Sequence, residues 1–194
     1  MRILRAATYR VMPWKNGGGT TTEIAVSPEN AGLDDFDWRI SMARVESGGA
    51  FSTFAGIDRT LAVLEGEGIL LDVAGHAPAR LTGASAPFSF PGDAPTSAQL
   101  VGGPITDLNV MTRRGRMTHK VERLALSDAI EIESVADATV ILATGGVAIA
   151  SDKPSMLGPL DAMILDRNSQ KLRLEPAGQG LLFVIRINGL AANH

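Results

Sequence analysis

Short apolar runs separated by glycine and proline make up most of the chain. Residues 36–45 alternate, with Trp38 and Ile40 on one face and Arg39 and Ser41 on the other, as the side chains of a β-strand do. Comparable runs rich in Val, Ile, Leu and Thr cover residues 20–26, 60–64, 68–73, 162–166, 171–175 and 181–187. The pattern predicts an all-β protein of short strands and tight turns.

A weak internal repeat divides the chain into two halves. Residues 60–68, TLAVLEGEG, resemble residues 139–146, TVILATGG, in the order of an apolar strand followed by a glycine turn. An aspartate-centred turn follows each of them, at 91–93 and at 159–161. The order predicts a duplicated β unit.

Each half is expected to close on itself, because closure removes the unpaired edges of a set of short antiparallel strands. We predict one barrel over residues 1–116, with the ligand site, and a second over residues 117–194. Residues 121–130 are ambiguous and are compatible with a helical turn between the halves.

Composition and charge exclude several classes of protein. The chain has 194 residues, a net charge of −3 and no cysteine, which removes disulfides, thiolate nucleophiles and cysteine-based metal sites. Arg2, Arg5 and Arg10 interrupt the segment where a signal peptide would be apolar, and residues 138–150 are too short to cross a bilayer. The basic cluster at 113–116 is small. We therefore expect a cytoplasmic protein with neither nucleic acid nor membrane as a partner.

Five segments follow one another in a specific order: MPWKNGGGTTTEIA at 12–25, FDWRISMA at 36–43, FSTFAGIDRT at 51–60, LEGEG at 64–68 and DLNVMTRR at 107–114. Together they resemble the HutD/Ves family, small bacterial proteins linked to histidine utilisation. The resemblance covers most of the chain up to about residue 116. It implies a bicupin fold, two fused cupin-like β-barrels of the double-stranded β-helix type. It also implies an accessory or regulatory role in histidine breakdown through binding of a pathway intermediate.

Metal-dependent cupins resemble one another in their ligand set, which is an HxH pair followed by a glutamate and, in a later strand, a further histidine. The histidines of this chain do not form that set. The chain has His76 in an expected turn, His119 after the basic cluster and His194 at the last position. No two of them have ligand spacing, so we predict neither a metal ion nor another cofactor. No Ser–His–Asp set can be assembled either.

The glycine-rich run contains Lys15, Asn16, Gly17 and Gly18. It is not a nucleotide P-loop, because the lysine precedes the glycines instead of following them. Two interpretations stay open from the residues alone. The run is either a flexible connector before a strand, or a loop whose amides, with Lys15 and Asn16, bind a carboxylate at the mouth of the barrel. The family resemblance favours the second interpretation.

Two pairs of polar residues each share one face of a predicted strand. Arg39 and Ser41 form the first pair, and Asp107 and Asn109 form the second, on another strand. By default such a face is the solvated side of a half-buried sheet. If it points into a barrel, it creates a pocket with convergent donors and acceptors. Arg39 is then the best carboxylate clamp, because its planar fork donates two parallel hydrogen bonds.

Two further groups complete the predicted site. Glu23 and Asp107 are acceptors suited to an amine, amidine or imidazole N–H of the ligand. Arg113, at the end of the last motif, is placed near the mouth of the first barrel. The complete predicted ligand site is Lys15, Asn16, Gly17, Gly18, Glu23, Arg39, Ser41, Asp107, Asn109 and Arg113.

Three hypotheses follow. The first is a non-enzymatic, metal-independent bicupin that senses or buffers a small carboxylate such as urocanate, formiminoglutamate or N-formylglutamate. The second is a metal-independent isomerase or hydrolase in which Glu23 or Asp107 is the general base and Lys15 or Arg39 stabilises an anion. The third is a structural partner with vestigial pockets. A homodimer stays open in all three.

Overall fold

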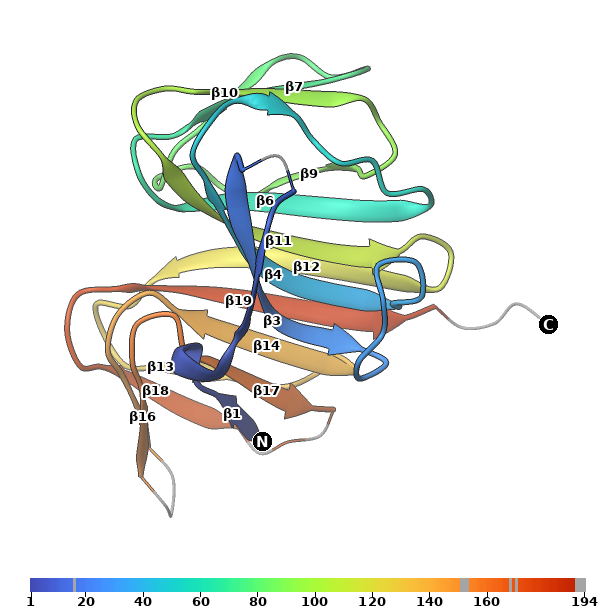
Figure 1. Cartoon of the computed structure of the whole chain (residues 1–194). Coiled ribbons are helices and arrows are strands. Elements are labelled where there is room, and N and C mark those ends of the chain that lie inside the picture. Colours follow the sequence, from blue (N-terminus) through green and yellow to red (C-terminus); the bar gives the residue numbers. More distant parts are fainter. Residues whose placement is uncertain (16, 151–153, 168, 170, 191–194) are drawn as a thin grey trace. The chain divides into compact units, whose positions relative to one another are not determined.

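The computed structural model describes residues 1–15, 17–150, 154–167, 169 and 171–190 (Figure 1). Within these ranges the regular secondary structure is β-strand, as the alternation predicts, apart from one short 3-10 turn, η1 (Ala6–Thr8). None of the helical structure in this described part of the chain is long and apolar enough to span a membrane. The chain divides into two compact units, which are described separately below.

The first unit, here called the N-terminal barrel, contains residues 10–118 and Leu190. It is built from a six-stranded sheet in the order β2-β3-β4-β11-β6-β9 and a four-stranded sheet in the order β5-β10-β7-β8. The strands of the larger sheet are β2 (Arg10–Pro13), β3 (Gly19–Ser27), β4 (Trp38–Val45), β11 (Ile105–Arg113), β6 (Ile57–Glu65) and β9 (Phe88–Pro91). Those of the smaller sheet are β5 (Gly49–Ala50), β10 (Thr96–Leu100), β7 (Ile69–Val73) and β8 (Ala79–Leu81).

The second unit, here called the C-terminal barrel, contains residues 1–9 and 119–189. Its five-stranded sheet has the order β1-β17-β14-β19-β12, and its four-stranded sheet has the order β13-β18-β15-β16. The strands of the larger sheet are β1 (Arg2–Leu4), β17 (Ala162–Asp166), β14 (Ala138–Ala143), β19 (Leu181–Gly189) and β12 (Met117–Ala125). Those of the smaller sheet are β13 (Ile130–Ile132), β18 (Leu172–Pro176), β15 (Val147–Ala150) and β16 (Ser155–Leu157).

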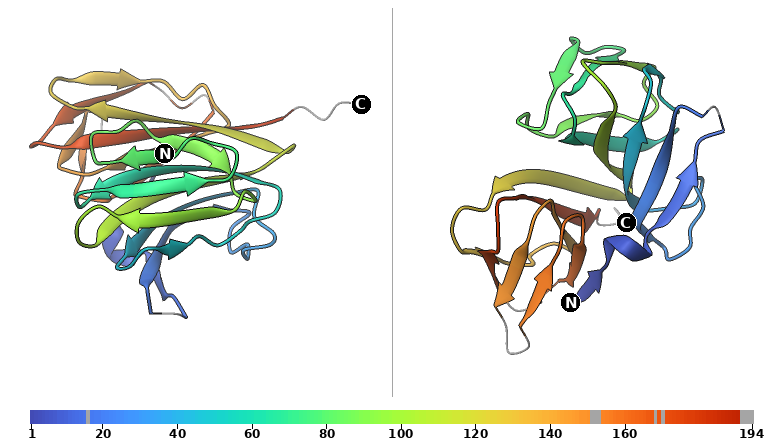
Figure 2. Two further views of the ribbon diagram at one scale, coloured as in Figure 1. Left: turned by 90° about the horizontal axis from the view of Figure 1, so that it is seen from above. Right: turned by 60° about the vertical axis from the view of Figure 1, so that its left-hand side comes forward.

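Side-chain alternation fills each barrel from both of its sheets. In the N-terminal barrel, Leu61 and Val63 of β6 belong to the same core cluster as Ile69 and Leu71 of β7. Figure 2 shows the strands of each unit curving into a barrel-like arrangement. The C-terminal cluster is built in the same way from Ile141, Met163 and Val184 of one sheet and Val147, Ile149 and Leu174 of the other.

The structure resolves one ambiguity in the chain's organisation and corrects one prediction. Residues 121–130, ambiguous in sequence with a helical turn as one possibility, contain no helix: residues 121–125 belong to the strand β12 (Met117–Ala125), beside β19 at the edge of the five-stranded sheet, and Ile130 begins β13. The first nine residues, expected in the N-terminal barrel, belong to the C-terminal one, because β1 pairs antiparallel with β17 (Figure 1). The carboxylate of Asp161 fixes this segment by accepting hydrogen bonds from Arg5 at 2.7 Å and from the Ala6 N–H at 2.8 Å.

The glycine turn predicted between β6 and β7 has a steric requirement. Gly68 has φ +129°, and a Cβ at this position would lie 2.3 Å from the carbonyl oxygen of Leu81. A residue with a side chain would therefore collide with β8 as well as strain the backbone. Glycine allows the hairpin to pass close to β8.

Candidate functional site

Polar side chains from four neighbouring strands face the inside of the N-terminal barrel. In the sheet register Ser41 lies opposite Glu23 on one side and Asn109 on the other, and Met111 lies opposite both Arg39 and Arg59. Paired residues share a face, so these side chains point the same way as the core residue Leu61, which pairs with Asn109. The exposed fractions of the five most buried members are 5% for Arg39, 2% for Ser41, 8% for Arg59, 1% for Asp107 and 3% for Asn109.

One part of this layer is an ion pair between β3 and β4. The Nε of Arg39 donates to Oε2 of Glu23 at 2.7 Å. The side chain of Arg39 is 6% exposed, whereas that of Glu23 is 20% exposed. Glu23 is therefore the member through which the ion pair reaches water.

The other part is a chain of hydrogen bonds between β6 and β11. Arg59 donates from Nε to Oδ1 of Asn109 at 2.8 Å and from a terminal nitrogen to the same oxygen. The amide of Asn109 in turn donates to Asp107. The guanidinium carbon of Arg59 lies 4.6 Å from the ring centre of Phe51 and 5.6 Å from that of Phe90, which is cation–π distance.

Burial changes the acid–base behaviour of this chain. Desolvation raises the pKa of Asp107 to about 6, against opposing contributions from Arg59, the Asn109 amide and a backbone N–H. Desolvation also lowers the pKa of Arg59 to about 10, an effect that Asp107 opposes and the like charge of Arg39 reinforces. The layer thus offers two guanidinium groups and one carboxyl that can exchange a proton near neutral pH.

The glycine-rich run forms the hairpin between β2 and β3. The Trp14 N–H donates to the Gly19 carbonyl at 2.9 Å, and the Gly17 N–H donates to the Trp14 carbonyl at 3.1 Å. Lys15 and Gly17 are exposed in this turn. The carbonyl of Gly18 accepts a hydrogen bond from the N–H of Glu46, the residue that follows β4, at 3.0 Å. Asn16 lies outside the described residues. The turn ends at Gly19, four residues before Glu23 on β3, which is about 13 Å away along an extended strand.

The last glycine of this run positions a tryptophan. A Cβ on Gly19 would lie 2.1 Å from the Arg44 carbonyl and 3.1 Å from the Trp14 ring. The Trp14 indole N–H donates to Thr21 Oγ1 at 2.8 Å, and its ring packs against the apolar core of the barrel. Gly19 therefore lets Trp14 cover the core beside Thr21.

Arg113 holds a loop at the far end of β11. It donates from Nε to the Phe36 carbonyl at 3.0 Å and from a terminal nitrogen to the Asp34 carbonyl at 2.6 Å. Its guanidinium also lies 5.7 Å from the Phe36 ring centre. Among the predicted site residues, the structure thus joins Glu23, Arg39, Ser41, Asp107 and Asn109 in one interior layer, and places Lys15, Gly17, Gly18 and Arg113 in turns and loop contacts.

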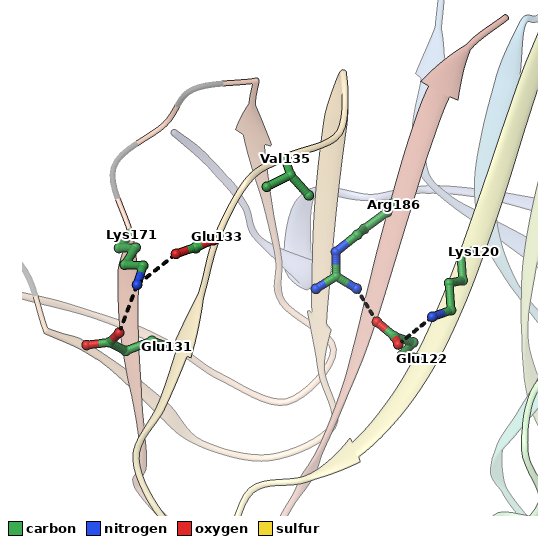
Figure 3. Close-up of a pocket in the computed structure, with 7 residues that line it drawn as sticks. All are labelled: Lys120, Glu122, Glu131, Glu133, Val135, Lys171 and Arg186. Carbon is green, nitrogen blue, oxygen red and sulfur yellow. Dashed lines mark hydrogen bonds and ion pairs between the residues drawn. The ribbon is translucent and has the colours of Figure 1, made fainter.

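The polar layer is specific to the N-terminal barrel. In the C-terminal barrel β19 pairs with β14 as β11 pairs with β6, but the inward residues of β19 are Leu182 and Val184 where β11 has Asp107 and Asn109. A groove of about 610 Å³ lies at the end of this barrel (Figure 3). It is lined by Lys120, Glu122, Glu131, Glu133, Val135, Lys171 and Arg186.

The ion pairs of this groove are half-buried at Arg186 and largely exposed at Lys171. Lys171 binds Glu133 at 2.7 Å and Glu131 at 3.6 Å, and all three side chains are more than half exposed. On the opposite wall Arg186 and Lys120 both bind Glu122. The exposed pairs of Lys171 contribute about 0–1 kcal/mol, and no member of the groove is as buried as Arg39 or Arg59. The interior layer of the N-terminal barrel is therefore the better candidate site.

The comparison with known proteins agrees with the motifs. The sequence model of the HutD family matches residues 6–183. The chain belongs to the HutD family. It is 36% identical over 182 residues to an uncharacterized 21.2 kDa protein in the hutC 3′ region of Pseudomonas putida, covering 92% of this chain and 94% of that one. It is also 32% identical over 171 residues to protein Ves of Cronobacter sakazakii, covering 88% and 90%.

Solved structures show the same fold. HutD from Pseudomonas fluorescens SBW25, crystallised in a formate condition, superposes with a TM-score of 0.83 at 30% identity, covering 98% of this chain and 99% of that one. An oxalate decarboxylase superposes with a TM-score of 0.65 at 9% identity over 97% of this chain and 77% of its own, a likeness of fold alone. The predicted bicupin architecture is confirmed.

Sequence reasoning missed Arg59 and the aromatic rings beside it. Arg59 lies in the matched HutD segment 51–60, but the strand was predicted from residue 60, one position too late to give Arg59 a face. Extending the alternation from Leu61 and Val63 back by two residues would have placed Arg59 inward. Phe51 and Trp14 carried no such signal, because both lie outside strands, directly after β5 and β2, and their packing depends on contacts distant in sequence.

The two histidines that the structure describes, His76 and His119, do not lie together in a metal-binding cluster. In the described ranges no three His, Cys, Asp or Glu side chains are arranged to hold a metal ion. His76 is exposed and contacts the edge of the Phe88 ring at 6.2 Å between centres. His119 lies in β12, in a different sheet, and His194 is outside the described residues. The absence of a bound metal stays a prediction.

Proposed function

We propose that the N-terminal barrel binds a small carboxylate-bearing ligand without a metal ion, and that the protein is an accessory or regulatory component of histidine utilisation. The hut names of its relatives supply the biological setting. Urocanate, formiminoglutamate and N-formylglutamate are pathway intermediates that all carry a carboxylate. Urocanate has one carboxylate and an imidazole at its other end, whereas formiminoglutamate and N-formylglutamate have two carboxylates and a nitrogen-bearing group on the α-carbon.

The pair of buried arginines carries this proposal. Arg39 and Arg59 are 5% and 8% exposed inside the barrel. Removing a guanidinium from water is costly, and an apolar filling of the kind seen at Leu182 and Val184 would avoid that cost. A planar, permanently charged fork is well suited to a carboxylate. Asp107 and Asn109 then face the ligand's nitrogen-bearing end.

A ligand screen with spatial mapping tests this proposal. Melting curves are recorded with the three intermediates, with EDTA present throughout, and a binding ligand at a hundred times its Kd should add about 2.7 kcal/mol of stability. A ¹H–¹⁵N correlation titration then locates the site. Shifts should concentrate on β3, β4, β6 and β11, with β14 and β19 as the internal control. Failure of all three intermediates to bind, or shifts confined to the C-terminal barrel, would contradict the proposal.

The raised pKa of Asp107, at about 6, favours a second candidate function, a metal-independent isomerase or hydrolase. A buried carboxyl that titrates near neutral pH can accept a proton from a bound substrate, and the neighbouring guanidiniums can stabilise a developing anion. NMR spectra of each intermediate incubated with the protein and EDTA separate the two functions. An enzyme converts the ligand and loses that conversion in Asp107→Asn, whereas a binder leaves the ligand unchanged.

A further inference from the structure

The ion pair between Glu23 and Arg39 joins a fixed cation to an anion that has access to water. Arg39 lies in the regular part of β4, and its side chain is 6% exposed. Glu23 is 20% exposed and lies where the β3–β4 register shifts, between Glu23 and Ala25. Such a bulge interrupts the ladder and redirects a side chain. Glu23 can therefore leave Arg39 without crossing the core.

The bond that Glu23 makes is one a ligand can improve. Glu23 accepts through Oε2 from the Nε of Arg39 at 2.7 Å. A guanidinium presents its N–H groups as a planar fork, and a carboxylate in the plane of that fork can accept two parallel hydrogen bonds. A ligand carboxylate that reaches Nε and a terminal nitrogen together gains a second strong bond.

A second cation is available to a displaced Glu23. Arg10 of β2 lies directly opposite Glu23 in the β2–β3 register and is exposed. Side chains of directly opposed residues are neighbours on the same face, with Cβ atoms about 5 Å apart. Glu23 can thus exchange the buried Arg39 for the exposed Arg10.

We propose that Glu23 occupies, in the free protein, the place on Arg39 that a ligand carboxylate takes on binding, so that the site selects small ligands with a net charge of −1. This inference rests on the proposed ligand binding in the N-terminal barrel. Before the exchange, the charges of Glu23 and Asp107 balance those of Arg39 and Arg59. After it, the ligand carboxylate restores the balance.

Other ligand charges do not preserve this balance. A neutral ligand that displaced Glu23 would leave Arg39 buried without a partner. A dianion such as N-formylglutamate would bring one uncompensated negative charge into the barrel, so the exchange favours urocanate over N-formylglutamate. Either state carries the penalty of an unpaired buried charge. The site therefore selects ligands by their net charge, because only a monoanion can replace Glu23 and leave the buried charges balanced.

Calorimetric titration of wild type and three variants tests the exchange, with acetate and urocanate as monoanionic probes and acetamide as the neutral one. Glu23→Gln removes the competing charge and should tighten binding of both monoanions by roughly tenfold or more. Arg10→Ala removes the cation that receives Glu23 and should weaken binding several-fold. Arg44→Ala, at an exposed position of β4, is the matched control and should bind within about twofold of wild type. Acetamide should bind none of them measurably.

Weaker binding of the monoanions by Glu23→Gln overturns the inference. If Glu23 instead accepts a hydrogen bond from the ligand, Glu23→Gln weakens binding, and ligand binding in the barrel stands without the exchange. If no probe binds any variant, the proposed function fails with it. Should Glu23→Gln not fold, Glu23→Asp replaces it, because a side chain one methylene shorter is a poorer competitor. That variant should show a smaller gain in affinity, and a loss would count against the exchange.

Discussion

Asp107 makes the stability of the N-terminal barrel depend on pH in an unusual direction. Its pKa of about 6 in the folded protein compares with 3.8 for an unperturbed aspartate. Between these values the folded state binds more protons than the unfolded state, so the free energy of unfolding falls as pH rises from about 4 to 6 and levels off above. A difference of about two pKa units corresponds to about 3 kcal/mol.

Urea unfolding of wild type, Asp107→Asn and Asp72→Asn measures this effect. Both tryptophans, Trp14 and Trp38, lie in the N-terminal barrel, so tryptophan fluorescence reports its unfolding. The difference in unfolding free energy between wild type and Asp107→Asn should move by about 2 kcal/mol in favour of wild type on going from pH 7.5 to pH 4.5. Asp72 is exposed on β7, and its variant should run parallel to wild type.

A constant difference between wild type and Asp107→Asn across this pH range would refute the reasoning. It would mean that Asp107 is ionised at the same pH in both states. A difference that moved in favour of the Asn variant at low pH would show that hydrogen bonding and Arg59 outweigh burial.

Two further predictions follow from the turn and from the histidines. Gly68→Ala should destabilise the N-terminal barrel by about 2–4 kcal/mol, because a Cβ there meets the Leu81 carbonyl at 2.3 Å. Gly75→Ala, at φ +84° in open space, should cost only about 1–2 kcal/mol in the same urea experiment, and equal losses would contradict the steric argument. Elemental analysis of the purified protein should find no stoichiometric transition metal, and about one zinc, iron, manganese or nickel per chain would exclude a metal-independent site.

Local alternation was sufficient to predict many of the longer strands and the inward layer of the site, but not the short strands such as β5, β8, β13 and β16. The period of two put Arg39 with Ser41 and Asp107 with Asn109, and these pairs do share the inside of the barrel. Alternation alone could not say which face is inside, because a polar stripe is the same sequence signal on either face. The matched family motifs decided that question.

Contacts between distant segments could not be predicted in this way. Strand β1 pairs with β17 across more than 150 residues, and nothing in the first residues specifies that partner. The predicted repeat is correct for β6 and β14, which occupy matching places in their sheets. It is wrong for the aspartate-centred turns, because the two aspartates do not occupy matching places. Asp93 follows β9 and binds Arg114, whereas Asp161 precedes β17 and binds Arg5.

Binding of urocanate to Arg39→Ala, measured by calorimetry beside wild type, tests the central claim most directly. Losing one partner of a desolvated charge pair costs about 2–5 kcal/mol, which at about 1.4 kcal/mol per decade is a loss of affinity of roughly thirtyfold or more. Arg39→Lys should recover part of it, since it keeps the charge but not the planar fork. Arg80→Ala, an exposed arginine of β8, should bind like wild type. Affinity of Arg39→Ala within about threefold of wild type would contradict the account.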